Sequence, residues 1–377
     1  MKRFMIIAGE ASGDLYGAML VNSLKDKRHE ISFMGIGGPK MKDAGVALFE
    51  RAENLSVVGI VEVLSRLKVI FSALSRAKKI LRTEKIDGLI LIDFPDFNFL
   101  LGRYAKKLGI RIFYFVVPQV WAWRRNRIKV LKNFVYKCVP VLPLEKKILC
   151  DAGINAEYAG HPLIDLSKPD SDSQRIKERL NIPEGFKVIA LFPGSREREV
   201  KVHLPAMLNA CRRFASTKKN YFFVLSMAPT ISRDILEEEI QKVNLPVIIS
   251  AESAANILSI SDAGIAVSGT VTLEGALARK PLIVIYRLSW LTYIIAKPFV
   301  KVKFISLPNL ILDKMIYPEL VQEGITPESL SSELVEILKN DRYNSIVKDL
   351  DTVAQRLGDT GVVNRISEIF INSMVTE

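Results

Sequence analysis

The chain has 377 residues, of which 49% are hydrophobic and 25% are charged, and its formal net charge is +12 at pH 7. This length and composition predict a globular protein of about two domains. Its three cysteines are too far apart to form a metal site, which indicates free thiols in a reducing cytoplasm, and the lack of a run of about 18 apolar residues excludes a typical membrane span.

The excess positive charge lies in the first half of the chain. Residues 1–160 contain 27 Lys and Arg against 15 Asp and Glu, whereas residues 161–377 contain 26 of each class. A basic half of this kind is typical of a protein that meets nucleic acid, an anionic membrane or an acidic substrate, although a solvated basic face gives the same pattern. No nucleic-acid-binding signature is present, so a nucleic acid partner is not expected.

Short apolar runs that alternate with helical patterns predict an α/β fold. The expected strands are residues 2–8, 31–34, 88–92, 110–117, 187–192, 221–226, 246–250, 264–267 and 282–286, and residues 306–311 are expected to form a loop. Residues 167–173 have the composition of a linker, so we place a domain boundary there. We expect one Rossmann-like domain at residues 1–166 and a second at 174–344, with the helices of residues 345–377 as candidates to pack back on the first.

The loop after the first strand is Gly9-Glu10-Ala11-Ser12-Gly13-Asp14, and a helix follows it at about residues 15–24. Its spacing is not the Gly-x-Gly-x-x-Gly of dinucleotide folds, and two acidic residues would repel a pyrophosphate. The loop therefore suits sugar hydroxyls better than phosphate. A plain acidic helix start is the alternative interpretation, and it fits nearly as well.

Two further stretches of the first half combine basic and apolar residues. Residues 60–82 have apolar side chains at helical spacing with basic residues between them. Such a helix can lie on an anionic bilayer, but most helices of this pattern only pack on a sheet. Residues 118–127 place Trp121 and Trp123 beside several arginines, which favours an anionic partner such as a phosphorylated glycolipid.

The apolar strand at residues 88–92 delivers Asp93-Phe94-Pro95-Asp96-Phe97-Asn98 to the sheet edge at which α/β folds bind ligands. A partly desolvated carboxylate at this edge can take a proton from an attacking hydroxyl, and Asp96 is the candidate general base. The alternative is that Asp96 only caps the helix that begins near Phe97.

Two loops of the second half predict phosphate binding. Ser268-Gly269-Thr270 lies between a buried strand and a helix, and its small residues let backbone N–H groups approach an anion at the helix start. Glu274, one turn later, can accept hydrogen bonds from ribose hydroxyls. Arg196, in Pro193-Gly194-Ser195-Arg196, can bind a diphosphate through its guanidinium. The alternatives are a capped helix start and a loop of self-paired charges.

Together these stretches resemble lipid-A-disaccharide synthase, a family of GT-B glycosyltransferases from Gram-negative bacteria. The similar stretches run in family order along nearly the whole chain: residues 9–14, 58–64, 93–98, 120–124, 193–196, 268–270 with Glu274, and 306–310. One departure is Phe94, which is larger than the small residue expected between Asp93 and Pro95. This departure concerns the shape of the acceptor pocket and not the chemistry.

The resemblance implies a GT-B fold, in which two Rossmann-like domains face each other across a cleft. It also implies that a 2,3-diacylglucosamine unit passes from its UDP conjugate to the 6-hydroxyl of 2,3-diacylglucosamine 1-phosphate, with inversion to a β linkage and release of UDP. Neither a metal nor another cofactor is implied. The family works as a peripheral protein at the inner face of the cytoplasmic membrane, an anionic surface, and some members are homodimers.

The resemblance also assigns residues, with Asp96 as the base and Arg196 as a diphosphate contact. The predicted substrate-binding residues, all from the similar stretches, are Glu10, Ser12, Asp14, Asn98, Trp123, Arg196, Ser268, Gly269, Thr270, Glu274 and Asn309. The rival hypotheses are another GT-B UDP-sugar enzyme, such as the transferase that acts on lipid I or a UDP-sugar 2-epimerase, and a non-catalytic membrane-binding protein.

Overall fold

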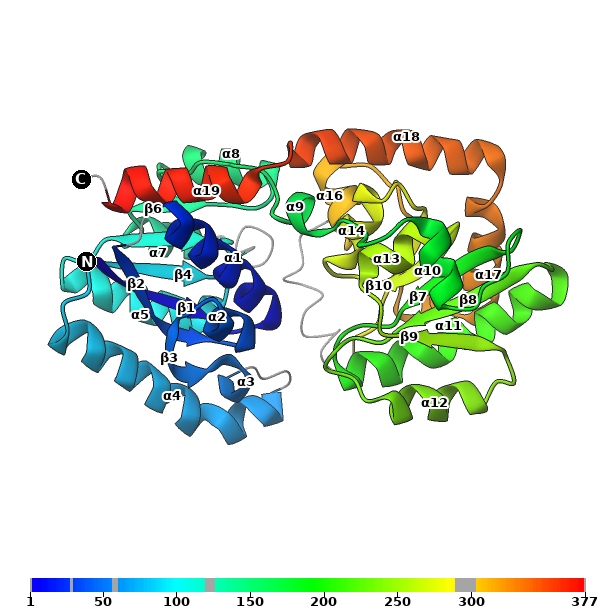
Figure 1. The fold of residues 1–377 in the computed structure, drawn as a ribbon, viewed down its shortest axis with the longest axis horizontal. Helices are drawn as coiled ribbons and strands as arrows, with labels where there is room; N and C mark the ends of the chain where they lie inside the picture. The colour runs from blue at the N-terminus through cyan, green and yellow to red at the C-terminus, as the bar shows by residue number, and fades with distance from the viewer. Residues whose placement is uncertain (1, 28–29, 56–59, 119–125, 289–302, 376–377) are drawn as a thin grey trace. The chain divides into compact units, whose positions relative to one another are not determined.

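The structure of the protein is a computed structural model that describes residues 2–27, 30–55, 60–118, 126–288 and 303–375. The stretch at 120–124, which includes the predicted contact Trp123, and the start of the stretch at 58–64 lie outside the described residues. The chain divides into two compact units, which are Met1–Asp165 with Gly358–Glu377, and Leu166–Leu357 (Figure 1).

The first unit is a six-stranded sheet in which every neighbouring pair of strands is parallel. Its strands, in the order β3-β2-β1-β4-β5-β6, are β1 (Lys2–Ala8), β2 (Ile31–Gly37), β3 (Ala47–Arg51), β4 (Gly88–Ile92), β5 (Ile112–Phe115) and β6 (Lys137–Val139). Its helices are α1 (Ala11–Lys27), α2 (Pro39–Asp43), α3 (Ala52–Leu55), α4 (Ile60–Thr83), α5 (Pro95–Lys107), α7 (Asn126–Lys132), α8 (Pro143–Asp151) and α19 (Val362–Phe370), followed by η2 (Ile371–Val375). The central strand β4 is apolar and buried along its whole length, as expected where helices cover both faces of a sheet.

The second unit repeats this architecture with a second six-stranded parallel sheet. Its strands, in the order β12-β11-β10-β7-β8-β9, are β7 (Lys187–Phe192), β8 (Tyr221–Ser226), β9 (Val247–Ser250), β10 (Ala263–Val267), β11 (Leu282–Tyr286) and β12 (Glu319–Val321). Its helices are α10 (Ser173–Arg179), α11 (Glu197–Thr217), α12 (Arg233–Gln241), α13 (Ala254–Ile260), α14 (Val271–Leu277), α16 (Leu307–Leu312), η1 (Gln322–Gly324), α17 (Pro327–Ile337) and α18 (Asn340–Leu357), and α9 (Leu163–Leu166) leads into this unit.

Both sheets have the strand order of a Rossmann fold, and the prediction of two Rossmann-like domains is confirmed. The strand order reverses between β1 and β4 in the first unit, and between β7 and β10 in the second. Open α/β sheets bind ligands beyond the carboxyl ends of their strands at such a topological switch point. The loops that follow these four strands are therefore the candidate ligand-binding loops.

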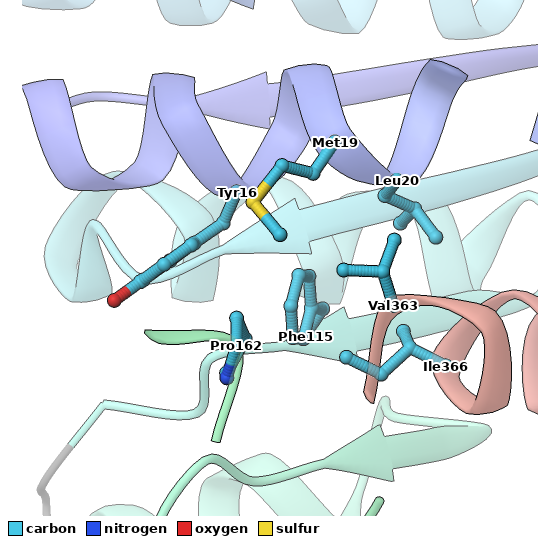
Figure 2. Close-up of a pocket in the computed structure, with 7 residues that line it drawn as sticks. All are labelled: Tyr16, Met19, Leu20, Phe115, Pro162, Val363 and Ile366. Atoms are coloured by element: carbon cyan, nitrogen blue, oxygen red, sulfur yellow. The ribbon is translucent and has the colours of Figure 1, made fainter. Parts of the chain in front are cut away.

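The last helix, α19, belongs to the first unit although it follows the second unit in the chain. Figure 2 shows how Val363 and Ile366 of α19 meet Leu20 of α1 and Phe115 of β5. Ile366, Leu20 and Phe115 are each 2% exposed or less, so their contact removes apolar surface from water and holds the helix on the unit.

A single carboxylate fixes the beginning of α19. Asp165, the last residue of the first unit before the chain leaves it, accepts N–H groups from Gly361 and Val363 at 2.7 and 3.0 Å. These groups belong to the first turn of the helix, whose N–H donors have no partners within the helix. The residue at which the chain leaves the first unit is thereby joined to the start of the helix with which it returns.

One local prediction is wrong. Residues 306–311 were expected to form a loop, whereas the structure has helix α16 over Leu307–Leu312. Pro308 lies in the first turn of this helix, where a proline is well tolerated because the turn has no need of its N–H.

Candidate active site

The loops after β1 and β4 lie at the same edge of the first sheet. The two strands are neighbours, and their last residues, Ala8 and Ile92, are register partners. The chain continues from β1 into Gly9 and Glu10, and from β4 into Asp93. A carboxyl group from each loop is therefore positioned at the switch point of this unit.

Asp93 has the environment of a proton acceptor. The pKa of its carboxyl group is raised from 3.8 to about 6, first by burial and then by the negative charge of Glu10, against a hydrogen bond from the N–H of Phe94 that lowers it. A carboxylate with a pKa near neutrality suits general base catalysis at neutral pH. The sequence interpretation passed over Asp93, and the signal that could have found it is its place directly after a fully apolar strand.

Asp96, the predicted base, lies three residues further on in the first turn of α5. Its side chain is 77% exposed and forms an ion pair with Arg127 of α7. The guanidinium of Arg127 also lies over the ring of Phe99, 5.6 Å from the ring centroid. An acidic residue in the first turn also stabilises the helix dipole, so the catalytic role of Asp96 stays a prediction.

The carboxylate of Asp14, a predicted substrate contact, forms its hydrogen bonds within the first unit. Its side chain is 4% exposed, and its carboxylate accepts the N–H groups of Gly38, Lys40 and Met41 at 2.7 to 3.0 Å. These bonds fix the loop after β2 at the start of α2. Ser12, another predicted contact, is half-buried in the first turn of α1.

Asn98 and Phe94 shape the turn that carries Asp93. Asn98, a predicted substrate contact, is 0% exposed, and its amide nitrogen donates to the carbonyl oxygen of Asp93 at 2.8 Å. Phe94 lies so close to Gly9 that a Cβ atom at position 9 would be 2.3 Å from its Cγ. The loop after β1 therefore requires glycine at this place because the ring of Phe94 fills the space.

The loops after β7 and β10 meet in the same way at the switch point of the second sheet, where Phe192 and Ala266 are register partners. Ser268 is held by its hydroxyl, which donates to the carbonyl oxygen of Ile305 at 2.7 Å. Gly269 and Thr270 are exposed and lead into α14. The predicted phosphate loop is thus a small-residue turn at the carboxyl edge of the sheet.

Arg196 lies in the adjacent loop, at the N-cap of α11. Its guanidinium donates to one carboxylate oxygen of Glu199 at 3.0 Å, and the N–H of Ser195 donates to the other at 3.2 Å. Gly194 has φ 110°, and a Cβ atom there would be 2.6 Å from Glu199 Oε2. Glu199 therefore holds in place the loop from which Arg196 can reach an anion.

Glu274 lies in the first turn of α14, and its environment also perturbs its carboxyl group. Burial raises its pKa from 4.5 to about 7, and no charge or hydrogen bond from the described residues offsets this rise. A partly buried carboxylate without donors is costly in a protein that binds nothing. This environment suits a group whose hydrogen-bond donors come from a ligand.

Asn309, the last of the predicted contacts, is 0% exposed. Its Oδ1 accepts the N–H groups of Ile316 and Tyr317 at 2.8 and 2.9 Å, and its Nδ2 donates to the carbonyl oxygen of Tyr317 and to Glu319 at 2.9 and 2.8 Å. The amide thus holds the segment that leads into β12. Its contact with a nucleotide donor stays a prediction.

Arg287, which the sequence interpretation did not include, adds a cation at the end of β11. Its guanidinium donates to the carbonyl oxygens of Gln322 and Ile325 at 3.0 and 2.8 Å, and its N–H donates to Nε2 of His203 at 2.9 Å. Burial lowers the pKa of His203, so the ring is neutral and its Nδ1 donates to the carbonyl oxygen of Glu199 at 2.8 Å. The sequence feature that could have identified Arg287 is its position directly after the apolar strand β11.

The two Rossmann-like units define a fold class, the GT-B fold that glycosyltransferases and UDP-sugar epimerases share. The S. aureus MnaA of a UDP co-structure has a TM-score of 0.68 at 14% identity, with 100% of this chain and 98% of that chain covered. The UDP-GlcNAc 2-epimerase of Neisseria meningitidis, bound to UDP-GlcNAc, gives 0.67 at 13% identity with full coverage of both chains. MurG of Acinetobacter baumannii gives 0.61 at 13% identity, covering 99% and 100%.

At the level of sequence, the lipid-A-disaccharide synthetase family model matches residues 4–369. The lipid-A-disaccharide synthase of Trichlorobacter lovleyi is 39% identical over 377 residues, which are 100% of this chain and 98% of the relative. That of Syntrophus aciditrophicus is 39% identical over 366 residues, covering 97% and 96%. The chain belongs to the lipid-A-disaccharide synthase family.

Within the described residues, no group of three or more His, Cys, Asp and Glu side chains is arranged to hold a metal ion. The charged groups described at the switch point of the first unit are carboxyl groups, and those at the switch point of the second unit are Arg196, Glu199 and Glu274.

Proposed function

We propose that the protein joins two acylated glucosamines into the lipid A disaccharide. The 2,3-diacylglucosaminyl unit of a UDP donor passes to the 6-hydroxyl of 2,3-diacylglucosamine 1-phosphate, and UDP is released. Membership of the family over nearly the whole chain supports a hexosyltransferase of this kind and does not favour an epimerase or a non-catalytic protein.

The observation that carries the chemistry is the contrast between the two switch points. In the first unit, Asp93 has a pKa of about 6 and can accept the proton of the acceptor hydroxyl. In the second unit, Arg196 and the loop at residues 268–270 can neutralise the diphosphate, while Glu274 can bind the ribose. We therefore assign the acceptor to the first unit and the donor to the second.

These assignments give a single displacement at C1 of the donor sugar. The acceptor oxygen forms a bond to C1 of the donor sugar as the bond from C1 to the diphosphate oxygen breaks. The departing UDP keeps the electron pair, and the hydroxyl proton passes to the carboxylate. Because attack and departure occur on opposite faces of C1, the α-linked donor gives a β-linked product.

Two acids compete for the role of base, and variants separate them. Asp96 is the residue favoured by the resemblance, but it is exposed and paired with Arg127, so we propose Asp93 as the base. Replacing the true base with Asn lowers turnover by about 10²- to 10⁴-fold while UDP still binds. Full loss in Asp96→Asn together with an active Asp93→Asn would return the role to Asp96.

The acylated substrates require the enzyme to work at a lipid surface. None of the described helices is long and apolar enough to cross a bilayer. Helices α4 and α5 pack together and expose Val69, Phe71 and Leu100, and Leu108 is exposed directly after α5. The exposed lysines 68, 79, 106 and 107 are on the same two helices. We propose that this α4–α5 surface docks on the anionic inner face of the cytoplasmic membrane, where the protein is peripheral.

A product assay tests the proposal. Purified protein with both lipid substrates should form UDP and disaccharide in equal amounts, and neither without the acceptor. An epimerase would instead convert the donor alone and release no UDP, and a binding protein would leave both substrates unchanged. Either of those results would overturn the assignment.

A further inference from the structure

Two buried side chains converge on one backbone atom of the acidic turn, the carbonyl oxygen of Asp93. The hydroxyl of Tyr114 on β5 donates to this oxygen at 2.7 Å, and the amide nitrogen of Asn98 on α5 donates to it at 2.8 Å. Both side chains are 0% exposed. Since the N–H of Asp93 also donates to the carbonyl oxygen of Val116 at 3.0 Å, the residue is fixed from two neighbouring elements.

This turn has a backbone conformation that residues other than glycine rarely adopt. Asp93 has φ 44° and Phe94 has φ 47°, which place both in the left-handed region. A Cβ atom makes this region unfavourable, so such residues persist only where their surroundings hold them. Asn98 contributes a second restraint, because its backbone N–H donates to the carbonyl oxygen of Phe94 at 3.0 Å.

The left-handed turn also determines where the ring of Phe94 lies. The ring occupies the space beside Gly9, and it stacks on Phe97 with the ring centroids 5.1 Å apart. It therefore fills the space between the loop that carries Glu10 and the loop that carries Asp93. An apolar ring in this place limits the access of water to the adjoining carboxyl group.

We propose that Tyr114 and Asn98 are positioning residues for the transfer reaction, because their hydrogen bonds to one carbonyl oxygen hold the turn that presents the Asp93 carboxyl group and the Phe94 ring at the switch point. The catalytic part of this inference rests on the proposed function. The conformational part concerns Asp93 alone and does not depend on any substrate.

The charged and titratable groups around Asp93 come from several elements. Glu10, from the loop after β1, acts on it directly, and the hydroxyl of Tyr114 faces it from β5. Arg127 of α7 acts on Tyr114 and pairs with Asp96 of α5. Tyr114→Phe removes one hydroxyl and leaves all these charges in place.

The experiment compares the wild type with Tyr114→Phe and with a matched control, Tyr104→Phe. Tyr104 is on α5 in the same unit, where its ring contacts Lys78 with the ammonium 5.5 Å from the ring centroid. For each protein, the pKa of Asp93 is measured by carbon NMR of its carboxyl group, and kcat and KM are measured against pH with both lipid substrates.

In Tyr114→Phe we expect the turn to relax and water to reach Asp93, so its pKa moves down toward the ordinary value of 3.8 and the acid limb of the rate profile follows. We expect kcat to fall about tenfold, as for the loss of one buried hydrogen bond, with KM near the wild-type value. Tyr104→Phe should show neither change. If Tyr114→Phe does not fold, Asn98→Ser removes the other donor to the same oxygen.

The two measurements separate the two claims. An NMR titration of Asp93 that is identical in Tyr114→Phe and the control would overturn the positioning role, whatever the activity. A wild type that forms no disaccharide would instead refute the proposed function, and the titration would still decide whether the hydrogen bonds position Asp93.

Discussion

Replacing Glu274 with Gln should stabilise the free protein while weakening its affinity for UDP. Because the folded-state pKa of Glu274 is raised from 4.5 to about 7, the folded protein binds this proton more tightly than the unfolded chain does. Stability is therefore lost as the pH rises from 4.5 to 7, and the full penalty applies above pH 7. A shift of this size corresponds to about 3 kcal/mol, which Gln avoids because it carries no charge.

The melting temperature and the affinity for UDP test this together. Without UDP, Glu274→Gln should melt roughly 6–12 °C higher than the wild type at pH 8, and at nearly the same temperature at pH 4.5. In the proposed donor site the ionised form of Glu274 binds the ribose hydroxyls, and the ionised fraction rises from about one tenth at pH 6 to about nine tenths at pH 8.

We therefore expect the affinity of the wild type for UDP, measured by calorimetric titration, to rise between pH 6 and pH 8. This rise should be up to about tenfold larger than the rise measured for the variant. The variant also controls for titration of the UDP phosphate, which affects both proteins equally. Equal melting temperatures at pH 8, or the same pH dependence of UDP binding in both proteins, would refute the role given to Glu274.

The remaining predictions concern the diphosphate and the membrane. Arg196→Ala should weaken UDP binding by about tenfold to a hundredfold, as for the loss of hydrogen bonds to a charged group. Arg198→Ala, an exposed neighbour in the same helix turn, should leave calorimetric affinity unchanged, and equal effects of the two variants would remove Arg196 from the site. Lys79→Glu combined with Lys106→Glu should reduce co-sedimentation with anionic liposomes, since each basic residue near such a surface contributes about 1 kcal/mol. The same changes at the exposed lysines 218 and 219 of the second unit should leave co-sedimentation unchanged. Unaltered sedimentation of the variant with Lys79→Glu and Lys106→Glu would exclude the α4–α5 surface as the docking face.

The interior of each sheet could be predicted from the sequence, and most of its edges could not. β1, β4, β7, β8 and β11 begin and end at the predicted residues. The middle residues of these strands are buried, so they appear in the sequence as apolar runs with polar residues only at the ends of β1, β7 and β8. The strands that were not predicted, β3, β6 and β12, all lie at sheet edges, where they are short, and β3 and β12 are largely half-exposed or exposed. Their apolar signal is correspondingly weak.

The site was predictable as a set of loops but not residue by residue. Asp93 and Asp96 both follow the apolar strand at residues 88–92 within four residues, and what decides between them is burial beside Glu10 for the first and exposure with an ion pair to Arg127 for the second. Both differences depend on tertiary structure, which no local pattern records.

The sequence also did not distinguish polar side chains that bind backbone groups from polar side chains that bind a ligand. Asp14 and Asn309 each lie in a stretch that resembles the family, as a substrate contact would, yet their side chains bind N–H groups of their own unit from helices α1 and α16. A polar side chain at a loop is required for either role, so only its partners decide between them.

The most direct test of the central claim is the anomeric configuration of the product, read by proton NMR from the coupling at C1 of the transferred sugar. In the proposed reaction the acceptor oxygen displaces the diphosphate directly from the opposite side of C1. We therefore expect a β linkage formed from the α-linked UDP donor. An α-linked disaccharide would contradict direct displacement, because retention of configuration requires a second displacement or attack on the side of the leaving group.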